Sequence, residues 1–194
     1  MRSVGREQPT WGCKFEHNTA APEPFELADG RHVTIRRIQP DDAPRLQRSI
    51  ARMSPETRRL RFFTPLKALT DDFAEHLANV DFVDRAAYVV CLEDEDDVRA
   101  VGRYELDGPG TAEVAFAVED EFQHLGIATE LLQHLAAHAR QNEIAVFTAI
   151  VLAENQDMLE VFRHGGFEFS ASSNGSVVNV SMQLEPVDAD PPHQ

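Results

Sequence analysis

Cysteine is scarce in this sequence, which contains only Cys13 and Cys91 among its 194 residues. Two thiols so far apart, with no Cys-x-x-Cys pair, predict neither a disulfide framework nor a zinc site. Long apolar runs are also missing: none approaches the ~20 residues that a membrane-spanning helix needs. Residues 1–14 lack the apolar segment of a secretory signal peptide. We therefore expect a cytoplasmic protein that makes no membrane contact.

Basic residues are outnumbered, with 18 Lys and Arg against 33 Asp and Glu and a net charge of −15. This balance argues against nucleic acid as a partner, because phosphate binding relies on Lys and Arg. It favours a cationic partner, such as a lysine side chain or another amine. An acidic surface also serves solubility alone, so the charge does not decide between the two interpretations.

The length and an ordinary content of 42% hydrophobic residues predict one globular domain. Residues 1–24 are polar and contain three prolines, which predicts a flexible N-terminal arm. Residues 186–194 contain three prolines and two aspartates, which is typical of a disordered tail. The domain itself is expected to span residues 25–185.

The first part of this domain predicts a hairpin followed by three helices. Asp29-Gly30 lies between two short strand-like segments, which is a hairpin signal. Each expected helix begins at a capping residue and carries apolar side chains at helical spacing. These starts and apolar positions are Asp41 or Asp42 with Ala43, Leu46, Ile50 and Met53; Ser54-Pro55 with Leu60, Phe62 and Phe63; and Thr70 with Phe73, Leu77 and Val80.

The rest of the domain alternates strands with helices. The pattern excludes an all-β sandwich and a helix bundle, and it predicts the α/β (α+β) class. Ile127, Leu131, Leu135 and Ala139 form one apolar stripe on the longest helix. The expected strands are 86–92, 100–106, 111–118, 145–151, 167–169 and 177–182, and the expected helices are 127–140 and 155–164.

A strand, a short loop and a helix start follow one another between Ala112 and Ala128. Small residues at Gly126 and Ala128 let an anion approach the backbone closely. The exposed N–H groups and the dipole at the start of a helix favour a phosphate there. These features predict an anion site without saying which anion, and a glycine at an ordinary strand-to-helix turn gives the same pattern.

Gln123-x-x-Gly126-x-Ala128 resembles the (Arg/Gln)-x-x-Gly-x-(Gly/Ala) signature of the GNAT superfamily of N-acetyltransferases. The resemblance implies the GNAT fold, a mixed and mostly antiparallel central sheet flanked by helices. It also implies acetyl-CoA as co-substrate, with backbone amides of the loop on the pyrophosphate and the end of the preceding strand on the pantetheine arm. The residues implicated in this binding are Phe116, Ala117, Val118, Gln123, His124, Leu125, Gly126, Ile127, Ala128 and Thr129.

Three further segments are similar to bacterial Pat-type protein lysine acetyltransferases: 27–36, Ser54-Pro55-Glu56-Thr57 and Arg61-Phe62-Phe63. In those proteins a glutamate at the place of Glu113 is the general base. An attacking amine must lose a proton, and a nearby carboxylate can take it. The resemblance therefore implies Glu113 as catalytic residue, against the alternative of an exposed strand glutamate.

The segment from Asn155 to Gly166 is similar to the GNAT Asn-helix-Gly-Phe segment, in which the Asn side chain contacts CoA. Many members place a tyrosine seven residues after that Asn, as the acid that protonates the leaving thiolate. This chain has Phe162 there, which cannot donate a proton. We expect Asn155 to contact CoA and Phe162 to form a wall of the CoA channel or part of the core.

Two other polar groups are assigned no chemistry. We interpret Glu119, Asp120 and Glu121 as a solvated acidic loop with helix-capping roles. His134 and His138 stand four apart on a helix, a spacing that can bind a metal ion, but no third ligand is evident. We place them on an exposed helix face and expect no metal site.

Together these observations predict an acyl-CoA-dependent N-acyltransferase that acetylates an amine, with a protein lysine as the leading acceptor. One alternative is transfer to a small amine or amino acid on the same fold. Another is a non-catalytic module that senses acyl-CoA, for which the absence of a tyrosine at position 162 leaves room. A monomer or a homodimer is expected, because the fold alone does not settle substrate or assembly.

Overall fold

The computed structural model describes residues 21–92, 95 and 97–184. Most of the predicted arm and the whole predicted tail lie outside these residues and stay predictions. Glu23 and Pro24, which we assigned to the arm, belong to the first strand. Within the described ranges, no helix is both long and apolar enough to cross a membrane.

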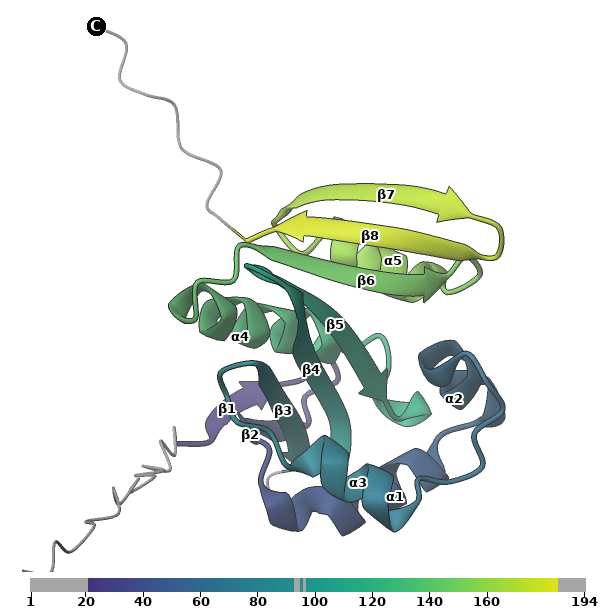
Figure 1. Ribbon diagram of the computed structural model, residues 1–194. Helices are drawn as coiled ribbons and strands as arrows, with labels where there is room; N and C mark the ends of the chain where they lie inside the picture. Colours follow the sequence, from purple (N-terminus) through teal and green to yellow (C-terminus); the bar gives the residue numbers. More distant parts are fainter. Residues whose placement is uncertain (1–20, 93–94, 96, 185–194) are drawn as a thin grey trace, which may run out of the picture.

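A hairpin and three helices open the fold, as predicted (Figure 1). Strand β1 pairs antiparallel with β2, and Gly30 adopts a left-handed φ of 86° in the turn between them. The Oγ atoms of Ser54 and Thr70 cap α2 and α3 by accepting hydrogen bonds from backbone amides. The bounds are β1 Glu23–Glu26, β2 His32–Arg37, η1 Pro40–Asp42, α1 Ala43–Arg52, α2 Pro55–Phe62 and α3 Asp71–Ala78.

The apolar face predicted for α3 is right in part: Leu77 and Val80 pack against the core, but Phe73 does not. Phe73 is 40% exposed, and the helix buries Ala74 and Ala78 instead. Small side chains let this short helix pack closely against α1 and the sheet, and Phe73 stacks on His76 at the surface. The short helix offers several apolar positions, and spacing alone did not identify the buried ones.

The remaining elements build one eight-stranded sheet in the order β1-β2-β3-β4-β5-β6-β8-β7. Of the seven strand pairings among the described residues, only that of β5 with β6 is parallel, which confirms the predicted mixed and mostly antiparallel sheet. The bounds are β3 Arg85–Leu92, β4 Val98–Gly108, β5 Thr111–Val118, η2 Asp120–Phe122, α4 Ile127–Gln141, β6 Val146–Leu152, α5 Gln156–Arg163, β7 Glu168–Asn174 and β8 Val177–Gln183.

Helices cover the two faces of the sheet unequally. The larger apolar core lies between the sheet and α4 with α5, and the predicted stripe of α4 is fully within it. A smaller core lies on the other face, under α1 and α3. Strand β6 is buried mainly on one face, because Phe147, Ala149 and Val151 are buried while Ile150 is 47% exposed.

Strands β5 and β6 stay together over a short distance only. They are paired from Thr111 with Val146 to Glu113 with Thr148, and the paired register ends there. Beyond that point β5 keeps β4 as its neighbour and β6 keeps β8, so the two halves of the sheet open away from each other (Figure 1). The backbone edges of two strands therefore face each other across a gap in the middle of the sheet.

The two histidines of α4 do not lie on an exposed face, which corrects the sequence prediction. His138 is only 5% exposed, and its Nδ1 lies 2.8 Å from the hydroxyl oxygen of the buried Tyr104. His134 is largely buried and contacts Glu23 through Nε2 at 3.1 Å. The buried stripe of α4 is wide enough to include position 138. Among the described residues there is no group of three or more His, Cys, Asp or Glu that could hold a metal ion.

The environment of His138 predicts that acid destabilises the fold. Burial, with a smaller contribution from the charge of Arg37, lowers the pKa of His138 from 6.5 to about 4. Between these values the unfolded chain binds the proton and the folded chain does not. The free energy of unfolding should therefore fall as the pH falls through this window, by about 3 kcal/mol in all.

The change His138→Asn removes this titration and keeps an oxygen or nitrogen near the Tyr104 hydroxyl. Urea unfolding at a series of pH values should give the variant a shallower pH dependence than the wild type between about pH 6.5 and about pH 4. Carboxylates titrate in both proteins and cancel in the comparison. Parallel curves for the two proteins would contradict the assignment.

Candidate active site

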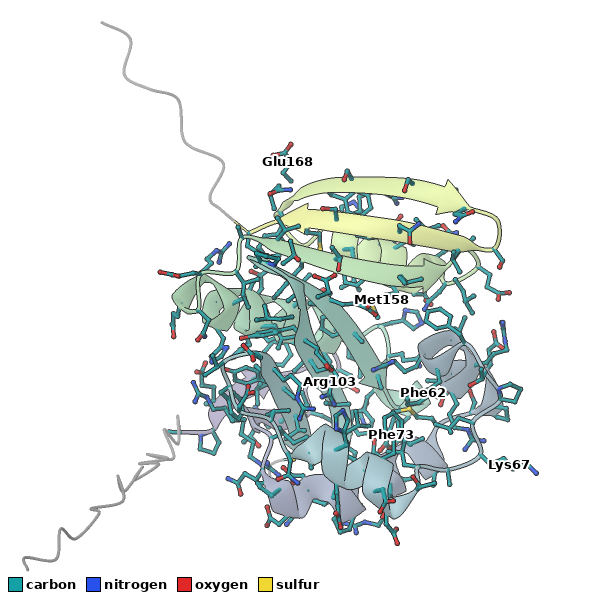
Figure 2. All side chains as sticks on the ribbon, in the orientation of Figure 1. Phe62, Lys67, Phe73, Arg103, Met158 and Glu168 are labelled. Carbon is teal, nitrogen blue, oxygen red and sulfur yellow. The ribbon has the colours of Figure 1, made fainter. Side chains whose placement is uncertain are left out.

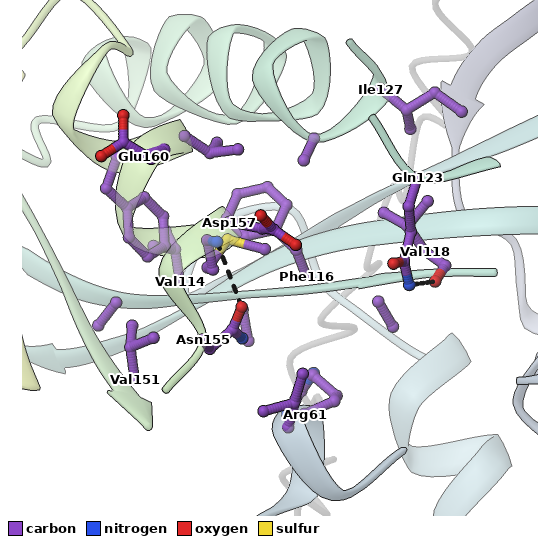
Figure 3. Close-up of a pocket in the computed structure, with 18 of the residues that line it drawn as sticks. Arg61, Val114, Phe116, Val118, Gln123, Ile127, Val151, Asn155, Asp157 and Glu160 are labelled. Atoms are coloured by element: carbon purple, nitrogen blue, oxygen red, sulfur yellow. Dashed lines mark hydrogen bonds between the residues drawn. The ribbon is translucent and has the colours of Figure 1, made fainter. Parts of the chain in front are cut away.

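The gap between β5 and β6 opens into a cavity of about 430 Å³. Helix α2 forms one wall, the start of α4 and the helix α5 form the others, and the diverging strands form the floor (Figure 3). All but one of the residues predicted to bind the cofactor line it. These are Phe116, Ala117, Val118, Gln123, His124, Gly126, Ile127, Ala128, Thr129, Asn155 and Phe162, and Glu113 lines it as well. Leu125 packs against the core instead.

The floor of the cavity offers backbone hydrogen-bonding groups. From Val114 to Val118, strand β5 pairs with β4 on one side, and its other edge faces the opening. In a strand, alternate residues present their N–H and C=O groups to each side. A ligand lying in the gap can therefore take the place of the missing strand and satisfy these groups.

The start of α4 lies at one end of the cavity, the end for which the sequence predicts an anion site. Gly126 is the N-cap with a left-handed φ of 89°, and within the described part of the chain no side chain caps this helix. The first intrahelical hydrogen bond runs from Glu130 N to Gly126 O, so the amides of residues 127–129 have no partner within the helix. These amides line the cavity together with the positive end of the helix dipole.

The acidic loop before α4 is solvated at Asp120 and Glu121, as predicted, but not at Glu119. Glu119 is 2% exposed, and its carboxylate accepts hydrogen bonds from Arg52 at 2.6 Å and from Arg99 at 3.3 Å. These partners come from α1 and β4, elements far away in the sequence, so local composition gave no sign of them. The buried carboxylate joins the loop to both elements.

Asp120 and Gln123 attach the same loop to helix α2. Asp120 accepts hydrogen bonds from Ser54 N and Thr57 Oγ1, both at 2.8 Å. Burial alone would raise the pKa of Asp120, but these bonds hold it below its ordinary value. The amide of Gln123 donates to Val118 O at 3.1 Å and to Thr57 Oγ1 at 3.2 Å. The predicted capping role of this loop is thereby found at α2, which it fixes beside the cavity.

Glu113 stands where β5 and β6 separate. It is paired with Glu105 on β4 and with Thr148 on β6, in the last register pair of the parallel contact. Its side chain is exposed and lines the cavity, and no described residue donates a hydrogen bond to it. A carboxylate in this position is free to accept a proton from a molecule that enters the gap.

Helix α5 closes the cavity opposite α2. Asn155 caps it by accepting a hydrogen bond from Met158 N at 3.2 Å, which leaves its amide nitrogen available on the cavity side (Figure 3). Phe162 is 1% exposed and packs against Phe116 with ring centroids 5.9 Å apart. It is both a core residue and a wall of the cavity, so the two predictions for it hold together. His124 is exposed and lies 3.7 Å from Asp157.

Sequence reasoning did not assign Arg61 to the site. Its segment was noted only for its family resemblance, but the residue lines the cavity from α2. Burial lowers the pKa of Arg61 to about 10, and the charge of Glu113 opposes this shift. Arg61 therefore stays protonated at neutral pH. Leu60 from the same helix, Phe63 just after its end and Ile150 from β6 add apolar surface that was likewise not predicted to belong to the site.

Comparison with known proteins agrees with this geometry. A family model described as an acetyltransferase (GNAT) domain matches residues 32–168. An acetyltransferase of Pseudomonas aeruginosa is 32% identical over 144 residues, which cover 73% of this chain and 77% of that protein. The acetyltransferase Pat of Mycolicibacterium smegmatis is 30% identical over 172 residues, 88% of this chain; the chain spans 51% of the length of that Pat.

Among solved structures, the GNAT domain of S. lividans PAT superposes with a TM-score of 0.77 at 33% identity. The match covers 84% of this chain and 96% of that domain. The two chains therefore share the GNAT fold over most of their length.

The start of α4 predicts a matched pair of glycine variants. Acetyl-CoA at 100 times its Kd should stabilise the wild type by about 2.7 kcal/mol. Gly126→Ala places a methyl group where a phosphate would approach, and tenfold weaker binding would leave about 1.4 kcal/mol. Gly30→Ala is the control, because Gly30 has a similar φ of 86° and no atom within 4 Å of an added Cβ.

Both alanine variants carry the same kind of backbone strain, so both should melt earlier than the wild type. Only Gly126→Ala should show a reduced stabilisation by acetyl-CoA in thermal melts, about half that of the wild type. An equal ligand shift in the two variants would show that no phosphate contacts the backbone at residue 126.

Proposed function

The chain belongs to the GNAT family of acetyltransferases, and from that premise we propose that it transfers the acetyl group of acetyl-CoA to a lysine side chain of a protein, with Glu113 as the general base. The observation that carries the proposal is the position of Glu113. No described residue donates a hydrogen bond to this carboxylate, which stands at the point where the cavity begins.

The two ends of the cavity fit the two ends of an acyl-CoA. The free amides of residues 127–129 suit the pyrophosphate, and the unpaired edge of β5 suits the amide groups of the pantetheine arm. Asn155 and Phe162 border the same channel. A ligand held at both ends would place its thioester near Glu113, which is the role that the family resemblance implies.

The chemistry at Glu113 follows from the charge of the acceptor. A lysine side chain has a pKa near 10.4 in water, so at neutral pH most of it is an ammonium ion without a lone pair. Glu113 takes one proton from the amine, directly or through a water molecule, and the nitrogen attacks the thioester carbon. No acyl-enzyme is needed, because both substrates lie in one cavity.

An open approach to Glu113 supports a protein acceptor over a small amine. Ile150 lines the cavity and is 47% exposed, and Asn179 beside it on β8 is also exposed. Glu105 and Asp107 lie exposed on β4 near Glu113. An open surface with carboxylates at its edge suits a lysine presented by a folded protein, whereas a small amine is better held in a closed pocket.

Acetylation of folded proteins tests the proposed acceptor. The enzyme is incubated with acetyl-CoA and a lysate of intact proteins, and modified lysines are found by mass spectrometry, while free amines and amino acids are assayed in parallel. Lys14 and Lys67 are the only lysines of the chain, so self-acetylation is easily recognised; Lys67 projects away from the protein (Figure 2). Acylation of free amines alone would replace the protein-lysine proposal with the small-molecule one.

Glu113→Gln should lower turnover by about 10²- to 10⁴-fold at neutral pH, because the amide cannot accept the proton. The deficit should shrink as the pH rises, since more of the acceptor amine is then already neutral. The matched control is Glu168→Gln, which alters an exposed strand glutamate on β7, outside the cavity lining. Wild-type turnover by Glu113→Gln, with chemistry shown to be rate-limiting, would exclude Glu113 as the base.

A further inference from the structure

Arg61 is the one arginine or lysine among the described residues that line the cavity. It is half-buried, and it makes no hydrogen bond or ion pair with any described residue; its guanidinium lies over the ring of its neighbour Phe62 at 4.9 Å. The charge of Glu113 lies near enough to act on that of Arg61, but no hydrogen bond joins the two groups. The N–H donors of Arg61 are therefore open to an anionic group of a ligand that enters the cavity.

The fold determines which part of a bound ligand lies next to the charge of Arg61. The hydrogen bonds of Asp120 to Ser54 and Thr57 fix the first turn of α2 beside the phosphate end of the cavity. Arg61 lies one turn further along α2, away from that end, and its charge interacts with that of Glu113. Figure 3 shows Arg61 reaching into the cavity on the side of Asn155, apart from Gln123. Arg61 thus belongs to the reacting end of the cavity.

The reaction creates a negative charge that the cavity must stabilise. When the amine displaces the thioester, the electron pair of the C–S bond goes to sulfur and CoA becomes a thiolate. No tyrosine lies among the described cavity residues, because Tyr88 and Tyr104 are in the core on the α4 face of the sheet. Phe162 has no proton to give. The histidines of the cavity lining, His124 and His164, lie in the phosphate loop and at the end of α5.

We propose that Arg61 is a further catalytic residue, whose guanidinium donates hydrogen bonds to the departing CoA thiolate. The inference rests on the proposed acetyl transfer. A C–N bond forms as the C–S bond breaks, Glu113 holds the proton released by the amine, and Arg61 keeps its own protons throughout. The proton on Glu113 passes through solvent to the thiolate, so acetyl-CoA and the amine yield the amide and CoA. While the C–S bond breaks, the charge of Arg61 thus stabilises the thiolate in place of a side chain that would protonate it directly.

The first test compares turnover of three variants. Arg61→Gln should lower kcat by about 10²- to 10³-fold with little change in the Kd for acetyl-CoA. Arg61→Lys keeps the charge and should retain more activity than Arg61→Gln. Arg59→Gln removes a charge from the same helix at a residue that pairs with Glu56 and Glu154 outside the cavity, and it should stay near wild type.

The second test measures the fraction of bound CoA that is a thiolate, and it requires no catalytic turnover. The ultraviolet absorbance of bound CoA, measured against bound desulfo-CoA at one mildly alkaline pH, reports the thiolate fraction. That fraction should fall about tenfold or more in Arg61→Gln and much less in Arg61→Lys. The same measurement on Arg59→Gln should match the wild type.

These readouts separate the outcomes. An unchanged thiolate fraction in Arg61→Gln, with CoA bound, would overturn the proposal, as would equal losses in the Gln and Lys variants. A raised KM for carboxylate-bearing substrates with an unchanged kcat would also overturn it, since Arg61 would then select an anionic substrate. If the wild type binds CoA as a thiolate but transfers no acetyl group, the proposed function fails and with it the catalytic role of Arg61, whereas a loss of thiolate in Arg61→Gln would still show that Arg61 contacts the sulfur.

Discussion

The parallel pairing of β5 with β6 ends at Glu113 and Thr148, and the arrangement of the site depends on that interruption. A continuous sheet would satisfy the edge of β5 with β6 and leave no room for a ligand. Because the strands separate, the backbone from Val114 to Val118 faces a cavity. The same interruption places Glu113 at the apex of the opening, where a base can meet the reacting atoms.

A second constraint is the attachment of α2 to the loop before α4. Asp120 and Gln123 bind the start of α2, and the buried Glu119 binds Arg52 just before it and Arg99 on β4. Partly buried charged hydrogen bonds of this kind are stronger than exposed ion pairs. These bonds fix the helix that carries Arg61 relative to the start of α4. The carboxylates of Glu119 and Asp120 thus hold the elements around the site together, in addition to contributing to the net negative charge.

Much of the fold could be predicted from the sequence, because its signals are local. The caps at Ser54 and Thr70, the turn at Gly30 and the stripe of α4 each depend on residues close together in the chain. The loop predicted to bind a phosphate could be placed before α4 for the same reason. The errors concern contacts between distant segments: the exposed Phe73, the buried Glu119 and the buried His138 each depend on which element covers them. Arg61 was not assigned to the site because its neighbour in the fold, Glu113, lies 52 positions away in the chain. No local pattern in the sequence indicates a contact over that separation.

The central claim is that acyl-CoA fills the opening between β5 and β6 and completes the sheet. Amide hydrogen exchange with and without saturating acetyl-CoA tests it most directly. The account predicts that the alternate amides of residues 114–118 that face β6, and those of residues 127–129, exchange about tenfold more slowly or better when the ligand is bound. Unchanged exchange at both places with the ligand bound, or protection confined to another surface, would contradict it.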